Sequence, residues 1–214
     1  MSKQFLLIVV IVIGLLGGVL VLTKKNENKP TQNGGAKSST EIPSHKVGNL
    51  SSKVTLTEYG DFQCPACKSY YPIVKQIKET NKDKIVFEFK HFPLVQIHPN
   101  SFVAARAAEA AGKQGKFFEY HDLLYENQDS WAQEQSPTPI FEEFAKQLGL
   151  NVDQFKKDVA SEQISSIINA NAKDAQTVGA NSTPTFFING KKITSPKSVE
   201  EFQKVIDEAL ASNK

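Results

Sequence analysis

The chain has 214 residues and only two cysteines, Cys64 and Cys67, so no third thiol can compete for either of them. It has no internal repeats and no basic stripe with interleaved aromatic residues. The formal net charge is only +2 and the lysines are dispersed, which argues against nucleic acid as a partner. Two cysteines and four scattered histidines are also a poor basis for a structural zinc site, which normally takes four Cys or His ligands.

The N-terminus lacks the small-residue cleavage site of a secretory signal peptide, since no alanine occurs before Ala36. Phe5 to Leu22 is an unbroken run of apolar residues and glycine. As a helix it spans roughly 27 Å, close to the thickness of a bilayer core. The run predicts a retained transmembrane anchor over residues 1–22, with a cleaved signal peptide as the alternative. The polar residues 23–47 predict a flexible tether, followed by a soluble domain over residues 48–214.

The soluble domain mixes strand and helix signals. Lys53–Tyr59 alternates and is rich in β-forming residues, and Pro65 then suits the first position of a helix that runs to about Asn81. Further strands are expected at Ile85–Phe92, Thr185–Ile188 and Lys191–Thr194, and further helices at 101–111, 117–125, 140–148, 152–159, 161–177 and from Ser198. Asn189-Gly190 predicts a tight hairpin between the last two strands. The order β-α-β, helical insertion (about 97–178), β-β-α predicts an α/β fold with a mixed sheet.

The two cysteines form a C-x-x-C motif at the predicted start of a helix, where unpaired N–H groups favour a thiolate. The helix dipole contributes only about 0.3–1 kcal/mol, which is less than one pKa unit. Direct N–H···S contacts and exclusion of water must therefore supply the rest. Cys67 lies one turn inward on the same face. We expect Cys64 to be the exposed attacking sulfur and Cys67 the shielded resolving sulfur of a thiol–disulfide exchange.

The pair has three alternative interpretations. A structural disulfide closing so short a loop stabilises by only about 2 kcal/mol, against about 3 kcal/mol for a fifteen-residue loop. A zinc site lacks ligands, and a pair of inert buried thiols is the third alternative. A C-x-x-C that follows a strand is a recognised redox arrangement, which favours exchange chemistry.

Glu58 stands in phase with Val54 and Leu56 on the first strand, so we expect it to face the core beneath the dithiol. A buried carboxyl has a raised pKa and can carry a proton for Cys67. The alternative is a strand end at which Glu58 reaches water. Base rates alone predict a trans peptide before Pro184.

The histidines give weaker signals. His91 is in phase with the apolar residues of its strand and is expected in the core. His45 falls in the tether, and His98 and His121 have no partner pattern.

Several segments together resemble the DsbA family of thioredoxin-like disulfide oxidoreductases, and its membrane-anchored members above all. They are EYGDFQCPAC, KHFPL, the helical insertion and STPTFFINGKK. The resemblance covers roughly Val47 to the C-terminus. It implies a thioredoxin-like fold with Cys64 as nucleophile, Cys67 as resolving thiol and Glu58 as the buried acid. It also implies that the Thr183–Pro184 peptide is cis, which reverses the base-rate expectation, and that the backbone of Thr183 pairs with an extended substrate.

One residue departs from the strong-oxidase pattern. Ala66 stands where that pattern has histidine, so its side chain cannot donate a hydrogen bond or a positive charge to the Cys64 thiolate. Thr183 before the proline also occurs in isomerase and reductase relatives. Both residues leave the direction of the reaction open.

The sequence therefore predicts a single-pass membrane protein with an extracytoplasmic thiol–disulfide oxidoreductase domain. Its substrates are unfolded or reduced exported proteins, and the resemblance implies a membrane quinone-linked thiol oxidase that reoxidises it. No cofactor or metal is expected beyond the Cys64–Cys67 disulfide. The alternatives are a disulfide reductase or isomerase on the same fold and a chaperone-like binding module. Binding alone needs no thiols, which separates the last alternative from the others.

Overall fold

The computed structural model describes residues 42–213. The expected anchor (1–22) and most of the expected tether lie outside the described residues. Within residues 42–213, no helix is long and apolar enough to cross a membrane. The strands are β1 (His45–Gly48), β2 (Thr55–Gly60), β3 (Val86–His91), β4 (Thr185–Ile188) and β5 (Lys191–Lys192). The helices are α2 (Pro65–Thr80), α3 (Ser101–Gly112), α4 (Phe117–Glu126), α5 (Gln128–Trp131), α6 (Thr138–Gln147), α7 (Val152–Val159), α8 (Glu162–Thr177) and α9 (Val199–Ser212).

The five strands form one mixed sheet in the order β1-β3-β2-β4-β5. β2 and β3 are parallel and joined through α2, whereas the β1–β3, β2–β4 and β4–β5 pairs are antiparallel. The predicted mixed sheet is confirmed. The Asn189-Gly190 hairpin is confirmed too, since both residues have positive φ, at 49° and 76°. Glycine tolerates this conformation freely and asparagine better than most residues.

The central strand β2 is covered on both faces. Leu56 belongs to the main hydrophobic core. Tyr59 points the other way, into a smaller cluster with Phe187 and Ala175 of α8. Because successive side chains of a strand alternate between faces, this arrangement buries β2 from Leu56 to Gly60. It also places Glu58 on the same face as Leu56.

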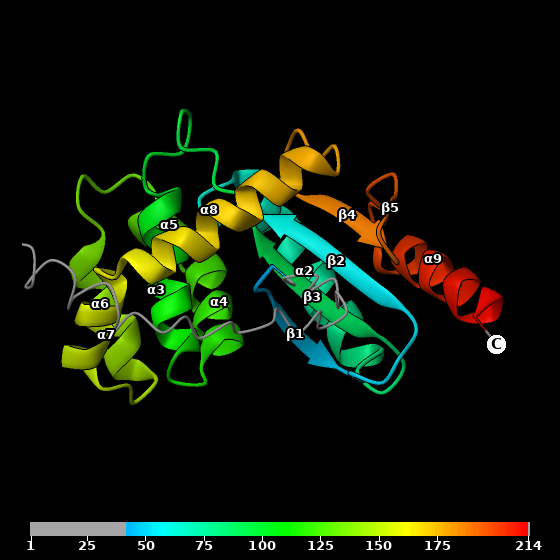
Figure 1. Cartoon of the computed structure of the whole chain (residues 1–214), viewed down its shortest axis with the longest axis horizontal. Coiled ribbons are helices and arrows are strands. Elements are labelled where there is room, and N and C mark those ends of the chain that lie inside the picture. The colour runs from blue at the N-terminus through cyan, green and yellow to red at the C-terminus, as the bar shows by residue number, and fades with distance from the viewer. Residues whose placement is uncertain (1–41, 214) are drawn as a thin grey trace, which may run out of the picture. The chain divides into compact units, whose positions relative to one another are not determined.

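The helices between β3 and β4 form the insertion. Figure 1 shows α3 to α7 gathered at one end of the domain, with α8 running from that group back to the sheet. α3 lies at the centre of the group, where its small buried side chains Ala104, Ala107, Ala108 and Ala111 allow α4, α7 and α8 to pack closely. α4 also contacts α2, which connects the insertion to the helix that carries the cysteines.

Two elements were not expected from the sequence. α5 is a single turn, and β1 includes residues 45–47 of the segment 23–47 that is predicted as a tether. That boundary was wrong: β1 pairs with β3 from His45↔Phe89 to Gly48↔Val86. The segment HKVG carries no apolar alternation, so its strand conformation comes from pairing at the sheet edge rather than from its own pattern.

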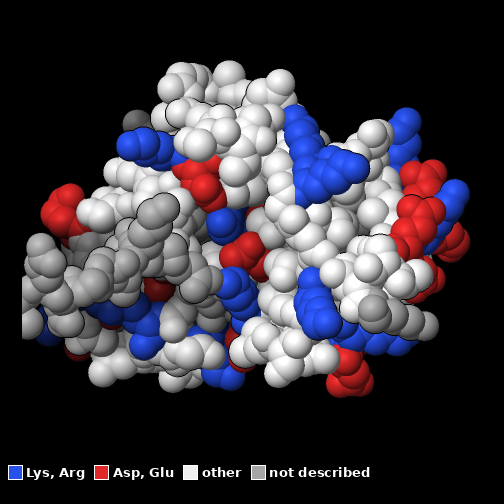
Figure 2. Space-filling model, turned by 45° about the vertical axis from the view of Figure 1, so that its right-hand side comes forward, with Lys and Arg blue, Asp and Glu red and all other residues white. Residues whose placement is uncertain are grey.

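Basic and acidic side chains are mixed on the face of the molecule that Figure 2 shows. On the face shown in Figure 2, the described Lys and Arg residues are interspersed with Asp and Glu and form no continuous basic stripe.

Candidate active site

The cysteine pair lies at the start of α2, just after the turn that follows β2. Cys64 is the N-cap of α2 in an extended conformation, and Pro65 occupies the first turn. The amide of Cys64 donates to the carbonyl of Asp61 (3.1 Å), and the carbonyl of Cys64 accepts the first helical hydrogen bond, from Lys68 (3.1 Å). Both cysteines are free thiols. The predicted position of Cys64 at a helix N-terminus is confirmed.

The prediction that Cys64 is exposed was wrong, because the structure buries it almost as deeply as Cys67. Cys67 is 1% exposed, as expected, but Cys64 is only 6% exposed. Two segments distant in sequence cover it. Gln128 of α5 donates to the Cys64 carbonyl (3.1 Å), and the carbonyl oxygen of Thr183 lies 3.4 Å from the Cys64 Sγ. The two thiols therefore differ less in access than a helical turn alone suggests.

The environment of Cys64 favours its thiolate. A hydrogen bond from the Cys67 thiol lowers the pKa of Cys64 most, to about 5, against the opposing effect of burial. Hydrogen bonds from the backbone amides of Cys67 and Ala66 lower it further, and so does the neighbouring side chain of Thr183. Ala66 therefore contributes through its backbone amide, although its side chain cannot.

The environment of Cys67 and Glu58 favours their protonated forms instead. Both groups lie on the buried side of Cys64. Burial raises the pKa of Cys67 well above its ordinary value, and the neighbouring Cys64 and Glu58 raise it further. Glu58 is 3% exposed, as its phase in β2 predicted. Burial raises the pKa of Glu58 to about 8, although the charge of Lys78 offsets part of the effect. A carboxyl with this pKa is protonated in most molecules at pH 7.

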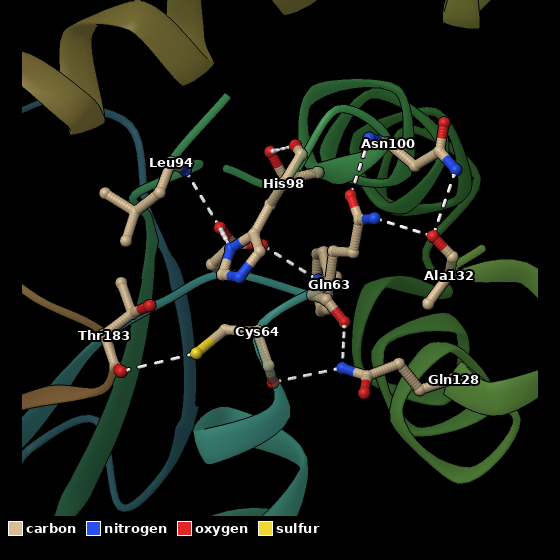
Figure 3. A network of polar contacts seen from close by, with 11 residues as sticks. Gln63, Cys64, Leu94, His98, Asn100, Gln128, Ala132 and Thr183 are labelled. Carbon is tan, nitrogen blue, oxygen red and sulfur yellow. Dashed lines mark hydrogen bonds and ion pairs between the residues drawn. The ribbon is translucent and has the colours of Figure 1, made fainter. Parts of the chain in front are cut away.

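The peptide between Thr183 and Pro184 is cis, as the family resemblance implied and against the base rate. It stands directly before β4 and turns the Thr183 carbonyl toward Cys64, as Figure 3 shows. The hydroxyl of Thr183 is buried and lacks a hydrogen-bond partner within residues 42–213.

Asp61, in the turn before the cysteines, ties this turn to the loop after β3. One carboxylate oxygen of Asp61 accepts from the Gln63 amide (2.8 Å). The other accepts from the Leu94 amide (2.9 Å) and is 2.7 Å from Nδ1 of His98. The carboxylate thus holds both ends of a loop whose tip carries Val95 and Ile97. The sequence showed no partner for His98 because Asp61 stands 37 positions earlier.

A second set of hydrogen bonds connects the reactive turn to the inserted helices. Gln63 accepts from the Asn100 amide (2.6 Å) and donates to the Ala132 carbonyl (2.6 Å). Gln128 donates to the carbonyls of Phe62 (2.7 Å) and Cys64. Figure 3 shows these contacts as one network beside the Cys64 sulfur. The sequence pattern gave no sign of the three polar residues Gln63, Asn100 and Gln128, because glutamine and asparagine carry no motif of their own.

Tyr125 of α4 is another residue that sequence reasoning missed. It is 1% exposed, and its hydroxyl has no hydrogen-bond partner in the described part of the chain. Its surroundings include Cys67, Glu58 and Asp61, whose charges add to burial in raising its pKa well above 10. His91 is buried as expected, but its partner is Glu109 and not the cysteine pair.

The sequence matches the family profile described as Thioredoxin over residues 40–208. It is 30% identical to a protein from Bacillus cereus described as probable disulfide bond formation protein D. That alignment spans 215 residues and covers 96% of this chain and 94% of the relative. Among solved structures, oxidised BdbD from Bacillus subtilis superposes with a TM-score of 0.68 at 26% identity, covering 78% of this chain and 92% of that one.

A different kind of relative matches only in part. Na(+)/H(+) antiporter NhaA 1 of Mycobacterium sp. (strain KMS) is 36% identical over 156 residues, which is 71% of this chain but 24% of the antiporter. The chain spans about a quarter of the length of the antiporters that it matches.

Proposed function

Because the chain belongs to the DsbA-like thiol–disulfide oxidoreductases of the thioredoxin family, we propose that it forms disulfide bonds in exported proteins by donating its Cys64–Cys67 disulfide. Cys64 is the sulfur attacked by the substrate, and Cys67 is the resolving thiol. The reverse activity, a reductase or isomerase, is the alternative within the same chemistry.

The observation that carries the direction of the reaction is the position of Cys64 at the N-cap of α2, where the Cys67 thiol and the backbone amides of Cys67 and Ala66 lower its pKa to about 5. A stabilised thiolate is a good leaving group, and its stability favours the reduced pair over the disulfide. A disulfide whose reduced form is stabilised is a strong oxidant. The hydrogen bonds from Cys67 and the Ala66 amide, together with the side chain of Thr183, thus supply what the Ala66 side chain lacks, and they favour the oxidase.

The exchange proceeds in two displacements. A substrate thiolate attacks the Cys64 Sγ of the disulfide, and the electron pair of the broken S–S bond goes to the Cys67 Sγ. A second substrate thiolate then attacks the substrate sulfur of the mixed disulfide, and Cys64 leaves as a thiolate. Two electrons move from the substrate to the pair, and the substrate keeps the new disulfide.

Glu58 is proposed to supply the proton that Cys67 takes up in the first displacement. Its carboxyl, with a pKa of about 8, holds a proton at pH 7 and lies on the buried side of the pair. The high pKa of Cys67 makes its thiolate a poor leaving group unless a proton arrives, which gives the acid a function. Glu58→Gln is expected to slow exchange without unfolding the domain. An unchanged rate would remove this role.

Substrate chains are proposed to bind in extended form against the backbone of Thr183, beside Pro184. The loop held by Asp61 offers apolar contacts next to this edge, since Val95 is 44% exposed and Ile97 is 69% exposed. An open hollow on the other side of Cys64 is lined by Gln63, Pro65, Lys68, Gln128 and Ala132 among others. Apolar side chains beside a polar hollow suit unfolded chains of varied sequence.

The domain is proposed to work outside the cytoplasm, anchored by residues 1–22, because disulfides persist in oxidising compartments. A membrane quinone-linked thiol oxidase is the proposed acceptor of the two electrons. No cofactor is proposed apart from the Cys64–Cys67 disulfide.

The reduction potential of the Cys64–Cys67 couple, measured against glutathione, tests the direction. An oxidase requires a value well above that of thioredoxin, which is about −270 mV, and nearer that of a strong oxidant at about −120 mV. A value near thioredoxin would overturn the oxidase and favour the reductase.

Two variants test the chemistry itself. Cys64→Ser should abolish disulfide transfer to a reduced two-cysteine peptide. Cys67→Ser has no disulfide to donate, but its Cys64 thiolate should attack the disulfide of an oxidised peptide, expel one peptide thiolate and remain trapped as a mixed disulfide. Full activity of the Cys64→Ser variant would exclude exchange. Retained suppression of aggregation in that variant would point to the chaperone-like alternative.

A further inference from the structure

Three side chains from separate elements converge at a point that the exchange reaction does not use. His45 of β1 and His91 of β3 each place Nε2 2.8 Å from the same oxygen, Oε1 of Glu109 on α3. The donor atoms of the three residues all lie within 4.8 Å of one another. A carboxylate oxygen only accepts hydrogen bonds, so each Nε2 carries a hydrogen in this arrangement.

The surroundings hold these groups in place. His91 is 1% exposed and Glu109 is 5% exposed. The ring of His45 stacks on Phe117, with the centroids 3.3 Å apart and the planes 5° from parallel. Gly112 makes room for this ring, since a Cβ there would lie 3.1 Å from the His45 Cε1. The cluster is therefore fixed by the same contacts that dock β1 on α3.

The donor groups themselves are of the kind that binds transition metals. An ionised carboxylate and two imidazoles that converge on one point are the donor set of many transition-metal sites. The side chain of His45 is 23% exposed, which leaves a path from solvent to the cluster.

We propose that His45, His91 and Glu109 form a binding site for a divalent transition-metal cation, with zinc as the best fit. Two imidazole nitrogens and one carboxylate oxygen give three protein ligands, and solvent completes the tetrahedron that zinc prefers. The hydrogens on the two Nε2 atoms leave when the ion binds, moving to Nδ1 or to the buffer. Imidazole ligands disfavour Ca²⁺ and Mg²⁺, which take oxygen donors.

The site joins β1, β3 and α3, so an ion there would clamp the N-terminal edge strand to the helical insertion. Binding to the folded state alone raises the stability of that state. Zinc is therefore expected to raise the melting temperature of the protein, and the cysteine chemistry takes no part in this effect.

Zinc binding is measured on the full chain with the Cys64–Cys67 pair oxidised, so that no thiolate competes for the metal. Equilibrium dialysis against ZnSO₄ at pH 7.5, followed by elemental analysis, is expected to saturate at one zinc per chain. Glu109→Gln and His45→Gln should each weaken zinc binding at least tenfold, on the order of the loss seen when metal-site residues are altered. The matched control His98→Gln removes a histidine that Asp61 holds elsewhere and should leave zinc binding unchanged.

The proposal is overturned if the oxidised protein binds no stoichiometric zinc, or if the two site variants and the control bind it equally. Circular dichroism establishes that each variant is folded before its affinity is compared. Co²⁺ in place of zinc should give the visible absorption of a tetrahedral site. Displacement of zinc by millimolar Ca²⁺ would contradict the donor set proposed. Because no measurement involves disulfide transfer, failure of the proposed oxidase activity and failure of this site are distinguishable.

Discussion

The carbonyl oxygen of Thr183 lies 3.4 Å from the Sγ of Cys64, while the hydroxyl of the same threonine is buried and unpartnered within the described residues. As a thiol, Cys64 donates to this carbonyl. As a thiolate it has no hydrogen to donate, and the side chain of Thr183 lowers its pKa. We therefore expect the thiolate to accept a hydrogen bond from the Thr183 hydroxyl in place of the bond that the thiol donates to the carbonyl.

Removing the hydroxyl tests this relationship. Thr183→Val is expected to raise the Cys64 pKa by about one unit, because one hydrogen bond contributes about 1 kcal/mol to the thiolate. The reduction potential should fall in the same variant. Titration of thiolate absorbance at 240 nm measures the pKa, and Thr183→Ser, which keeps a hydroxyl, should stay close to the wild type. An unchanged pKa in the valine variant would contradict the role of the hydroxyl.

The reduced protein should lose stability in acid because of Cys64. The pKa is about 5 in the folded state and about 8.5 in an unfolded chain, so the folded state binds fewer protons between these values. The resulting stabilisation is complete above about pH 8.5, is about 3 kcal/mol at pH 7, and vanishes as the pH falls through 5. Urea unfolding of the reduced wild type and of Cys64→Ser from pH 4.5 to 8.5 measures it, and the difference between the two should grow with pH. If the free energies of unfolding of the two proteins changed with pH in parallel, the lowered pKa of Cys64 would be refuted.

Glu58 should change the pH dependence of stability in the opposite direction from Cys64. Its pKa is about 8 in the folded state against 4.5 for an ordinary glutamate, so the folded state binds more protons between these values. The folded state therefore loses stability as the pH rises from 4.5 to 8. Glu58→Gln is expected to match the wild type near pH 4.5 and to exceed its free energy of unfolding by a few kcal/mol, as an order of magnitude, at pH 8. A variant less stable at pH 8 would show that the carboxylate has an unrecognised partner.

Two buried tyrosines of α4 offer a matched pair of variants. The hydroxyl of Tyr120 donates to the Phe141 carbonyl (2.8 Å), whereas that of Tyr125 has no partner in the described part of the chain. Tyr120→Phe should destabilise by about 1 kcal/mol, and Tyr125→Phe should stabilise by a similar amount, because an unpaired buried hydroxyl costs free energy. Urea denaturation measures both. If Tyr125→Phe is destabilising, its hydroxyl donates to a group near the cysteines in solution.

The buried side chain of Gln128 should contribute more to the free energy of unfolding than the side chain of Gln114, whose hydrogen bonds lie at the surface. Gln128→Met keeps the size of the side chain but leaves the Phe62 carbonyl without this donor, at a cost of about 1–3 kcal/mol in unfolding free energy. Gln114→Met is the control, since the hydrogen bonds of Gln114 to Asn151 lie at the surface. Equal losses in the two variants would mean that the buried network adds nothing to stability.

The sequence predicted those parts of the fold that depend on local pattern. Pro65 after Cys64 predicted the helix start, Asn189-Gly190 predicted the hairpin, and the phase of Glu58 with Leu56 predicted its burial. Each rests on backbone geometry or on the alternation of a strand, which neighbouring residues determine.

The missing parts depend on contacts between distant residues. β1 has no periodicity of its own, and its strand conformation follows from pairing with β3. Gln128 reaches Cys64 across 64 positions, and His98 reaches Asp61 across 37. The low exposure of Cys64 follows from such contacts, so the helical position alone overestimated its access. The cis peptide at Pro184 was expected only through the family resemblance.

The hydrogen bonds of Gln128 to the carbonyls of Phe62 and Cys64 have a consequence for protein engineering. Grafting only the four residues from Cys64 to Cys67 onto another thioredoxin scaffold is not expected to transfer their reactivity. The carbonyls of Phe62 and Cys64 accept hydrogen bonds from a side chain of the inserted helices, which such a graft would lack. A graft should keep the sulfurs yet lose the support of the turn around them. Transfer of the redox behaviour therefore requires α5 together with the motif.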